Sequence, residues 1–114
     1  MSLEQLLKDF LEYLEIERNV SKLTIRNYRH YLERFLGFLA GSPLSSGVKT
    51  VKSLEPSAIT TESVRQYRLY LSRYVDDHGI SLKRVTQNYH LIALRSVLKY
   101  LLKRDVPVMT PDKI

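Results

Sequence analysis

The chain contains four segments in which hydrophobic positions recur with the period of an α-helix. In the first segment, apolar side chains follow one another at spacings i, i+3, i+4 and i+7, which places them on one face of a helix. No segment alternates apolar and polar residues as a half-buried strand would, and we see no convincing internal repeat. The pattern therefore predicts an all-α protein, a small four-helix bundle. The expected helices span about residues 3–17, 22–40, 61–76 and 82–103.

The fourth segment differs from the others because its two halves are unlike. Its front half is polar, whereas residues 91–102 are apolar most of the way round. A helix that is apolar all round is buried. We therefore expect its back half to be the central helix of the bundle, with the polar front projecting from it. The inward residues expected on the third segment are Val64, Tyr67, Leu71, Tyr74 and Val75.

Capping residues and turn residues mark the expected helix ends. Ser21 precedes the second helix and Ser81 precedes the fourth, and serine is a favoured N-cap. Either Thr60 or Thr61 is expected to cap the third helix. The connection over residues 41–59 is rich in Gly, Ser and Pro and is longer than most loops. Its apolar residues would either pin parts of it to the core or leave it partly mobile. These residues are Val48, Val51, Leu54 and Ile59.

Length and composition describe a single domain. The 114 residues suffice for one small core, no cysteine is present, and no apolar run approaches the length of a membrane span. The N-terminus is amphipathic and acidic, unlike a signal peptide, so we expect a cytoplasmic protein. We assign residues 1–105 to a helical domain and residues 106–114, VPVMTPDKI, to an extended linker.

Charge is distributed unevenly along the chain. The net charge is +6, from 18 bases and 12 acids. Residues 1–19 hold two bases and five acids, a balance of −3, so the remaining 16 bases and seven acids give +9. A concentrated basic surface favours a polyanionic partner, and nucleic acid is the commonest. The alternative interpretation of this charge is a basic face that is merely solvated.

The first turns of the second and fourth helices contain bases where the helix dipole favours acids. Lys22 occupies this place in the second helix and Lys83 and Arg84 in the fourth, whereas Glu4 and Glu62 obey the rule in the first and third. Local rules are commonly broken where function requires it. Spacing predicts that Lys22, Arg26 and Arg29 form one stripe opposite the apolar face. It also predicts that Lys83 and Gln87 share a stripe flanked by Arg84 and Asn88.

These residue types suit duplex DNA. Lys and Arg neutralise phosphates or donate to guanine, and Gln and Asn form paired hydrogen bonds with adenine in the major groove. Hydroxyl groups at helix starts suit phosphate oxygens. The sequence therefore predicts a DNA-binding surface near the starts of two helices. Its candidate residues are Ser21, Lys22, Thr24, Arg26, Arg29, Ser81, Lys83, Arg84, Gln87 and Asn88.

Three segments resemble, in the right order, the N-terminal region of the tyrosine recombinases, the Xer and phage-integrase family. Ser21, Thr24 and Tyr28 match the Ser-x-x-Thr-x-x-x-Tyr signature of that family. The runs TTESVRQYRLYL (60–71) and LIALRSVLKYLLKR (91–104) are similar to its third and fourth helices, with Arg95 at the Arg position. The tail VMTPDKI resembles the Asn-Pro linker that leads to the catalytic domain, with Thr110 in place of Asn.

The resemblance implies a SAM-like, lambda-integrase-like N-terminal domain that clamps double-stranded DNA with its second and fourth helices. The expected partners are duplex DNA, the catalytic domain of the same chain and other recombinase protomers, with no membrane and no cofactor. The family's catalytic residues lie in a second domain, so this fragment is not expected to be an enzyme. Arg95 is ambiguous, because it would either contact phosphate or anchor the bundle.

Other interpretations remain open at this stage. The first helix has an acidic outer face, so the chain could be a helical protein–protein interaction module without direct DNA contact. A standalone helix-turn-helix regulator is less favoured, because the second and third helices are too far apart for its tight turn. His30, His78 and His90 match no metal-ligand spacing, and we interpret each as a surface residue. No tyrosine is interpreted as a nucleophile. Tyr28, Tyr67, Tyr74 and Tyr89 have core-like spacing.

Overall fold

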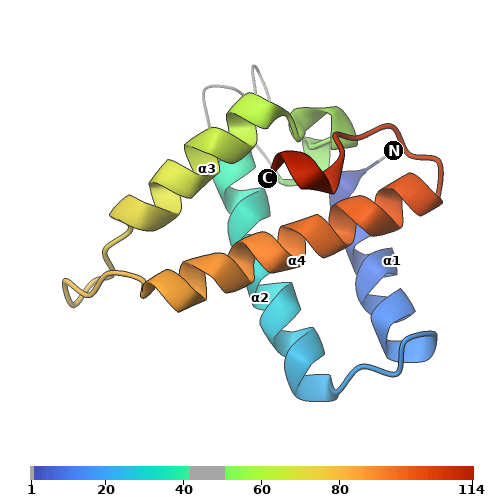
Figure 1. Ribbon diagram of the computed structural model, residues 1–114, viewed down its shortest axis with the longest axis horizontal. Helices are drawn as coiled ribbons and strands as arrows, with labels where there is room; N and C mark the ends of the chain where they lie inside the picture. The colour runs from blue at the N-terminus through green and yellow to red at the C-terminus, as the bar shows by residue number, and fades with distance from the viewer. Residues whose placement is uncertain (1, 42–50) are drawn as a thin grey trace.

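The computed structural model describes residues 2–41 and 51–114, and within them the chain forms four α-helices and no named strand. Helices α1 and α2 lie side by side and antiparallel, α4 crosses both, and α3 packs against α4 and the far end of α2 (Figure 1). The all-α prediction is confirmed. The helices are α1 (Leu3–Ile16), α2 (Lys22–Gly41), α3 (Thr61–Arg73) and α4 (Arg84–Lys103), with 3-10 turns η2 (Val51–Ser53), η3 (Pro56–Ala58) and η4 (Pro111–Lys113).

Side-chain caps start two of the helices as predicted. The Ser21 hydroxyl accepts a hydrogen bond from the backbone N–H of Thr24 (3.2 Å), which satisfies one free donor of α2. Thr60 caps α3 through a reciprocal capping box with Ser63, and each hydroxyl accepts from the other residue's backbone N–H. The start of α4 differs from its prediction. Its N-cap is Lys83, which makes no side-chain capping bond.

Ser81 does not cap α4, because it belongs to the turn that joins α3 to α4. It pairs with Val75 in an isolated antiparallel bridge, and Gly79 closes the turn with φ +77°. The Asp76 carboxylate accepts from the N–H groups of His78 and Ile80, so the turn satisfies its own donors. Helix α3 therefore ends at Arg73, earlier than predicted. Val75, expected to point inward, is 57% exposed.

Helix α4 is the centre of the bundle, as its apolar back half predicted. It contacts α1, α2, α3 and η4, and its residues Leu94, Val97, Leu98 and Leu101 are almost completely buried. The prediction that this half is covered all round was wrong. Ile92 lies on the outer side of α4, where no described element covers it, and is 41% exposed.

The segments around the helices add to the core. In the connection before α3, Leu54 and Ile59 are buried as expected, and the Leu54 carbonyl accepts from the N–H of Leu3 (2.9 Å), so the connection is tied to α1. Val51 is partly buried against the core, and the prediction for Val48 lies outside the described residues. No helix among the described residues is long and apolar enough to cross a membrane.

The C-terminal segment, predicted to be an extended linker, folds back along α4 instead (Figure 1). Val106 is buried, and Val108, Met109 and Ile114 pack against the core. The Arg95 guanidinium donates to the Ile114 carbonyl oxygen (3.1 Å). Apolar residues in the segment explain the difference, because they gain free energy when they leave water.

Candidate nucleic-acid interface

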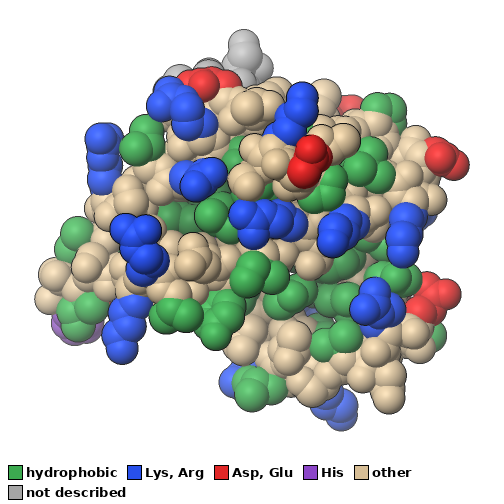
Figure 2. Space-filling view, in the orientation of Figure 1, with side chains coloured by type: hydrophobic (Ala, Val, Ile, Leu, Met, Phe, Trp, Pro, Cys, Tyr) green, Lys and Arg blue, Asp and Glu red, His purple; other side chains and the backbone are tan. Residues whose placement is uncertain are grey.

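The outer face of α4 is basic and free of acids. From Ile80 to Arg104 the sequence contains no Asp or Glu. Figure 2 shows the face that α4 crosses, where Lys and Arg side chains gather and few acids are visible. A face of one sign over the whole length of a helix is an attractive surface for a polyanion. The bases of this stretch are Lys83, Arg84, Arg95, Lys99, Lys103 and Arg104.

Most of these bases have no partner within the described part of the chain. Lys83, Arg84, Lys99 and Lys103 are exposed and form no side-chain hydrogen bond or ion pair there. Arg104 is different, because it donates to Asp9 of α1 (3.1 Å) and to the Tyr100 hydroxyl (2.9 Å). Arg104 therefore fastens α1 to α4, and Arg95 donates to the Ile114 carbonyl, whereas Lys83, Arg84, Lys99 and Lys103 are available for an external ligand.

A small hollow of about 200 Å³ lies where the start of α4 meets α3. Arg84 and Asn88 line it from α4, and Arg68 lines it from α3. Gln87 also lines it, but its amide nitrogen donates to the Leu82 carbonyl (3.0 Å) and so braces the loop before α4. The predicted stripe is thus divided. Asn88 is exposed to a ligand, whereas Gln87 is partly used inside the protein.

Arg68 contributes to the same basic face and was missed by the sequence argument. Its neighbour Arg65 is neutralised by a bidentate pair with Glu62, at 2.7 and 3.0 Å. Hydrogen bonds from Arg65 and Gln66 lower the pKa of the Glu62 carboxyl to about 2. Arg68 has no such acid in the described residues.

Lys99 and Lys103 were also not predicted from the sequence. Their spacing of four and eight residues after Arg95 is the signal that could have indicated them.

Only some of the DNA-contact residues predicted at the start of α2 lie beside the basic face of α4. Thr24 and Tyr28 line a groove of about 470 Å³ together with Lys99 and Lys103 of α4. The Ser21 hydroxyl donates to the Thr24 hydroxyl (2.9 Å), so these two groups form one polar unit at the helix start. Thr24 therefore lies on the α4 side of α2.

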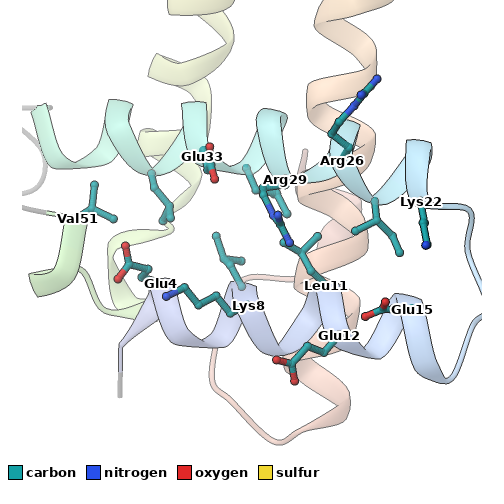
Figure 3. A pocket seen from close by; sticks show the side chains of 14 residues that line it. Glu4, Lys8, Leu11, Glu12, Glu15, Lys22, Arg26, Arg29, Glu33 and Val51 are labelled. Atoms are coloured by element: carbon teal, nitrogen blue, oxygen red, sulfur yellow. The ribbon is translucent and has the colours of Figure 1, made fainter.

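Lys22, Arg26 and Arg29 lie on the other flank of α2, which corrects the predicted position opposite the apolar face. They line a groove of about 910 Å³ between α1 and α2. Glu12 and Glu15 of α1 line the same groove, and Lys22 and Arg29 reach from α2 toward α1 while Arg26 points away (Figure 3). Within the described residues no ion pair joins these groups. The groove is thus a region of mixed charge.

The position of Lys22 and Arg29 on the α1 side of α2 follows from helix geometry. Each residue turns an α-helix by about 100°, so positions 22 and 29 lie beside the buried Leu32 and Leu36, whereas position 24 lies well round the helix from them. The predicted residues of α2 are therefore divided between two surfaces.

His90 connects α2 to α4, and its prediction as a surface residue was wrong. The ring is only 2% exposed; its Nδ1–H donates to the Thr86 carbonyl (2.7 Å) and its Nε2 accepts from Arg34 of α2 (3.1 Å). Burial lowers the pKa of His90, and nearby Arg34 and His30 act in the same direction, against the Thr86 hydrogen bond. A neutral imidazole is the form that fits both hydrogen bonds.

The other chemical groups give no sign of a catalytic or metal centre in residues 2–41 and 51–114. No group of three or more metal-ligating side chains occurs there. Tyr67 is completely buried, and its hydroxyl has no hydrogen-bond partner in that part of the chain. Tyr89, predicted at a core position, is 49% exposed because it lies on the outer side of α4.

Comparisons with known proteins agree with the fold. The model of the family described as phage integrase, N-terminal SAM-like domain, matches residues 7–105. The chain is also 31% identical over 108 residues to the tyrosine recombinase XerC of Bacillus pumilus (strain SAFR-032), a match that covers 95% of this chain. It spans only 30% of the length of that relative. No solved structure matches the chain.

Proposed function

Since this chain belongs to the phage integrase N-terminal SAM-like domain family, we propose that it binds duplex DNA in the cytoplasm and holds it for a catalytic domain elsewhere in the parent protein. That domain would cut and rejoin the DNA, and other protomers would assemble on the same DNA. The helical domain itself supplies binding and orientation. The observation that carries the proposal is the stretch from Ile80 to Arg104, which contains α4, has no acid, and carries four exposed cations without a partner among the described residues.

The dimensions of α4 suit this role. A helix of 20 residues is about 30 Å long, and an α-helix with its side chains fits the width of the major groove. Lys83, Arg84, Lys99 and Lys103 would neutralise phosphates along the groove, which supplies most of the affinity. Asn88 is placed to form paired hydrogen bonds with adenine.

The structure supports some of the predicted DNA-contact residues more strongly than others. Arg84 and Asn88 on the α4 face, Lys83 at its start and the Ser21–Thr24 pair beside Lys99 have the strongest structural case. Gln87 and Ser81 contribute from the rim, since both already have partners inside the protein. Arg95 serves the C-terminal segment through Ile114. Lys22, Arg26 and Arg29 could reach DNA only from the flank beside α1.

A second candidate function, docking of a protein partner, is favoured by one observation. The groove between α1 and α2 has mostly acidic residues on the α1 side and mostly basic residues on the α2 side. These charges are unpaired within the described residues, so they are available to a partner helix that carries both signs. This surface lies on the flank of α2 opposite Thr24, so both functions are compatible.

The test is a fluorescence-anisotropy titration with a duplex of about 30 base pairs at several salt concentrations. We expect log K to fall linearly with log salt, with a slope near −0.9 for each phosphate contacted. Replacing Lys22, Arg26, Lys83 and Arg84 with Ala should weaken binding while circular dichroism shows an unchanged fold. A quadruple variant that binds as well as the parent would show that the proposed surface is wrong. Absence of binding at low salt would favour the protein-docking function.

A further inference from the structure

Three large apolar side chains are exposed in a row on the outer face of α4. Val85, Tyr89 and Ile92 are 51%, 49% and 41% exposed. Their spacings of four and three residues place them on the same side of the helix. Single exposed apolar residues are common on proteins and need no explanation, but an aligned row on a helix otherwise rich in bases does.

The row lies at the centre of the outer face, beside an edge of basic and polar residues. The buried side of α4 is defined by Leu94, Val97 and Leu101. At about 100° per residue, Val85 and Ile92 lie directly opposite this side. Arg84, Asn88, Arg95 and Lys99 lie along one edge of the row, whereas Ser96 and Lys103 continue the row itself toward the end of the helix. The outer face of α4 thus has an apolar row with a polar and basic edge on one side and a base, Lys103, at its end.

The positive charge along the edge of the apolar row indicates which kind of partner could cover it. A protein partner that covers it would also have to bury or pair Arg84 and Lys99, which have no acid of their own among the described residues. Duplex DNA meets both demands, because a phosphate backbone that borders the major groove can pair with the basic edge while the base edges on its floor meet the apolar row. The apolar group displayed on that floor is the C5-methyl of thymine.

We propose that Val85 and Ile92 contact thymine methyl groups in the major groove and so determine part of the DNA sequence that the domain prefers. This inference rests on the proposed function. The two residues are seven positions apart, about 10.5 Å along the helix axis. Base pairs rise by about 3.4 Å. The preferred site should therefore contain two thymines about three base-pair steps apart, on either strand.

The first stage of the test is selection of preferred duplexes from a random pool at low salt. Each thymine of the selected site is then replaced by deoxyuridine, which removes the methyl group and keeps the base pairing. A buried methyl is worth about fourfold in affinity. We expect about a fourfold loss at each of two positions and no change at the other thymines.

Variants of the chain complete the test. Val85→Ala and Ile92→Ala should each abolish the difference between thymine and deoxyuridine at one position. Both side chains are exposed, so the fold should persist. Ile80→Ala is the matched control, because Ile80 is an exposed apolar residue (63%) outside α4, and it should leave both differences intact.

Two kinds of result would overturn the inference. If the domain binds DNA but deoxyuridine is tolerated everywhere, or if the alanine variants keep the thymine preference, the apolar row does not determine sequence and the proposed function stands. If no duplex binds at low salt, the proposed function fails and the inference fails with it.

Discussion

The starts of α2 and α4 look alike in the sequence and differ in the fold. Both carry bases in the first turn, against the preference of the helix dipole. At α2, the bases Lys22 and Arg29 reach toward α1 across a groove that Glu12 and Glu15 of α1 also line. At α4, Arg84 shares a hollow with another base, Arg68 of α3, and none of the described residues that line this hollow is an acid.

The difference shows that the effect of bases in the first turn of a helix depends on the elements that pack beside that helix. The acids of α1 offset the positive charge of α2 at a distance, so that surface is nearly balanced. The charge at α4 is reinforced by α3 and by its own later turns, and it remains uncompensated in the described part of the chain. The α4 face is therefore the stronger candidate for DNA, and the comparison can be tested directly.

Charge reversal should give the largest effect. We expect Lys83→Glu with Arg84→Glu to weaken duplex binding by on the order of 100-fold at moderate salt, because two attractive contacts become repulsive. The matched pair, Lys22→Glu with Arg29→Glu, should weaken it by about tenfold or less. Both are measured by anisotropy at the same salt concentration. An equal or larger loss for the α2 pair would reverse the ranking of the two surfaces.

The next largest effect is expected when capping residues at the starts of α3 and α4 are replaced and the losses of stability are compared. Ser63 is buried, takes part in the capping box with Thr60, and donates to the Ala58 carbonyl (3.0 Å). Ser63→Ala should therefore lower the free energy of unfolding by about 1–2 kcal/mol. Lys83→Ala should leave it nearly unchanged, because Lys83 makes no capping bond. Urea denaturation of the two variants measures this, and equal losses would contradict it.

Supplying the missing cap of α4 should separate stability from binding. Lys83→Asp adds an N-cap acceptor and a negative charge at the positive end of the helix dipole. We expect a gain of about 0.5–1 kcal/mol in the free energy of unfolding together with weaker DNA binding. Lys22→Asp at α2 is the comparison variant, since Ser21 already caps that helix. A variant of Lys83 that gains stability and keeps full DNA affinity would show that this position does not contact DNA.

The junction of α2 and α4 should give the smallest effect, a loss of stability at acid pH. Burial lowers the pKa of folded His90 below that of the unfolded chain. Below about pH 6.5, the ordinary pKa of histidine, the unfolded chain binds a proton that the folded chain does not. Stability is therefore full above this pH and falls as the pH decreases through the folded-state pKa.

Thermal melts of the parent and of His90→Gln across this range measure the effect. The variant should lose the part of the pH dependence that belongs to His90. His30→Gln is the control for the neighbouring ring, which lies 6.4 Å from His90. Parallel melting curves for parent and His90→Gln would show that His90 does not cause the acid sensitivity.

Most of the fold was predictable because it depends on local chemistry. The period of apolar residues located all four helices, and Ser21 and Thr60 marked two of their starts. The failures involve contacts between distant residues. His90 is buried because Arg34, 56 residues earlier, supplies a donor to its ring, and the C-terminal segment folds back because α4 offers it an apolar flank.

The amino-acid sequence alone determined that this chain is helical, which segments are helices, and that its positive charge gathers after the first helix, because hydrophobic period, capping and charge are properties of neighbouring residues. Tertiary structure alone decided which bases share a surface. The rotation of α2 against α1 turns Lys22 and Arg29 toward acids, and the crossing of α4 over the bundle leaves Arg84, Ile92 and Lys99 facing outward. Orientation of this kind arises from the packing of whole helices, so it cannot be read from any one of them.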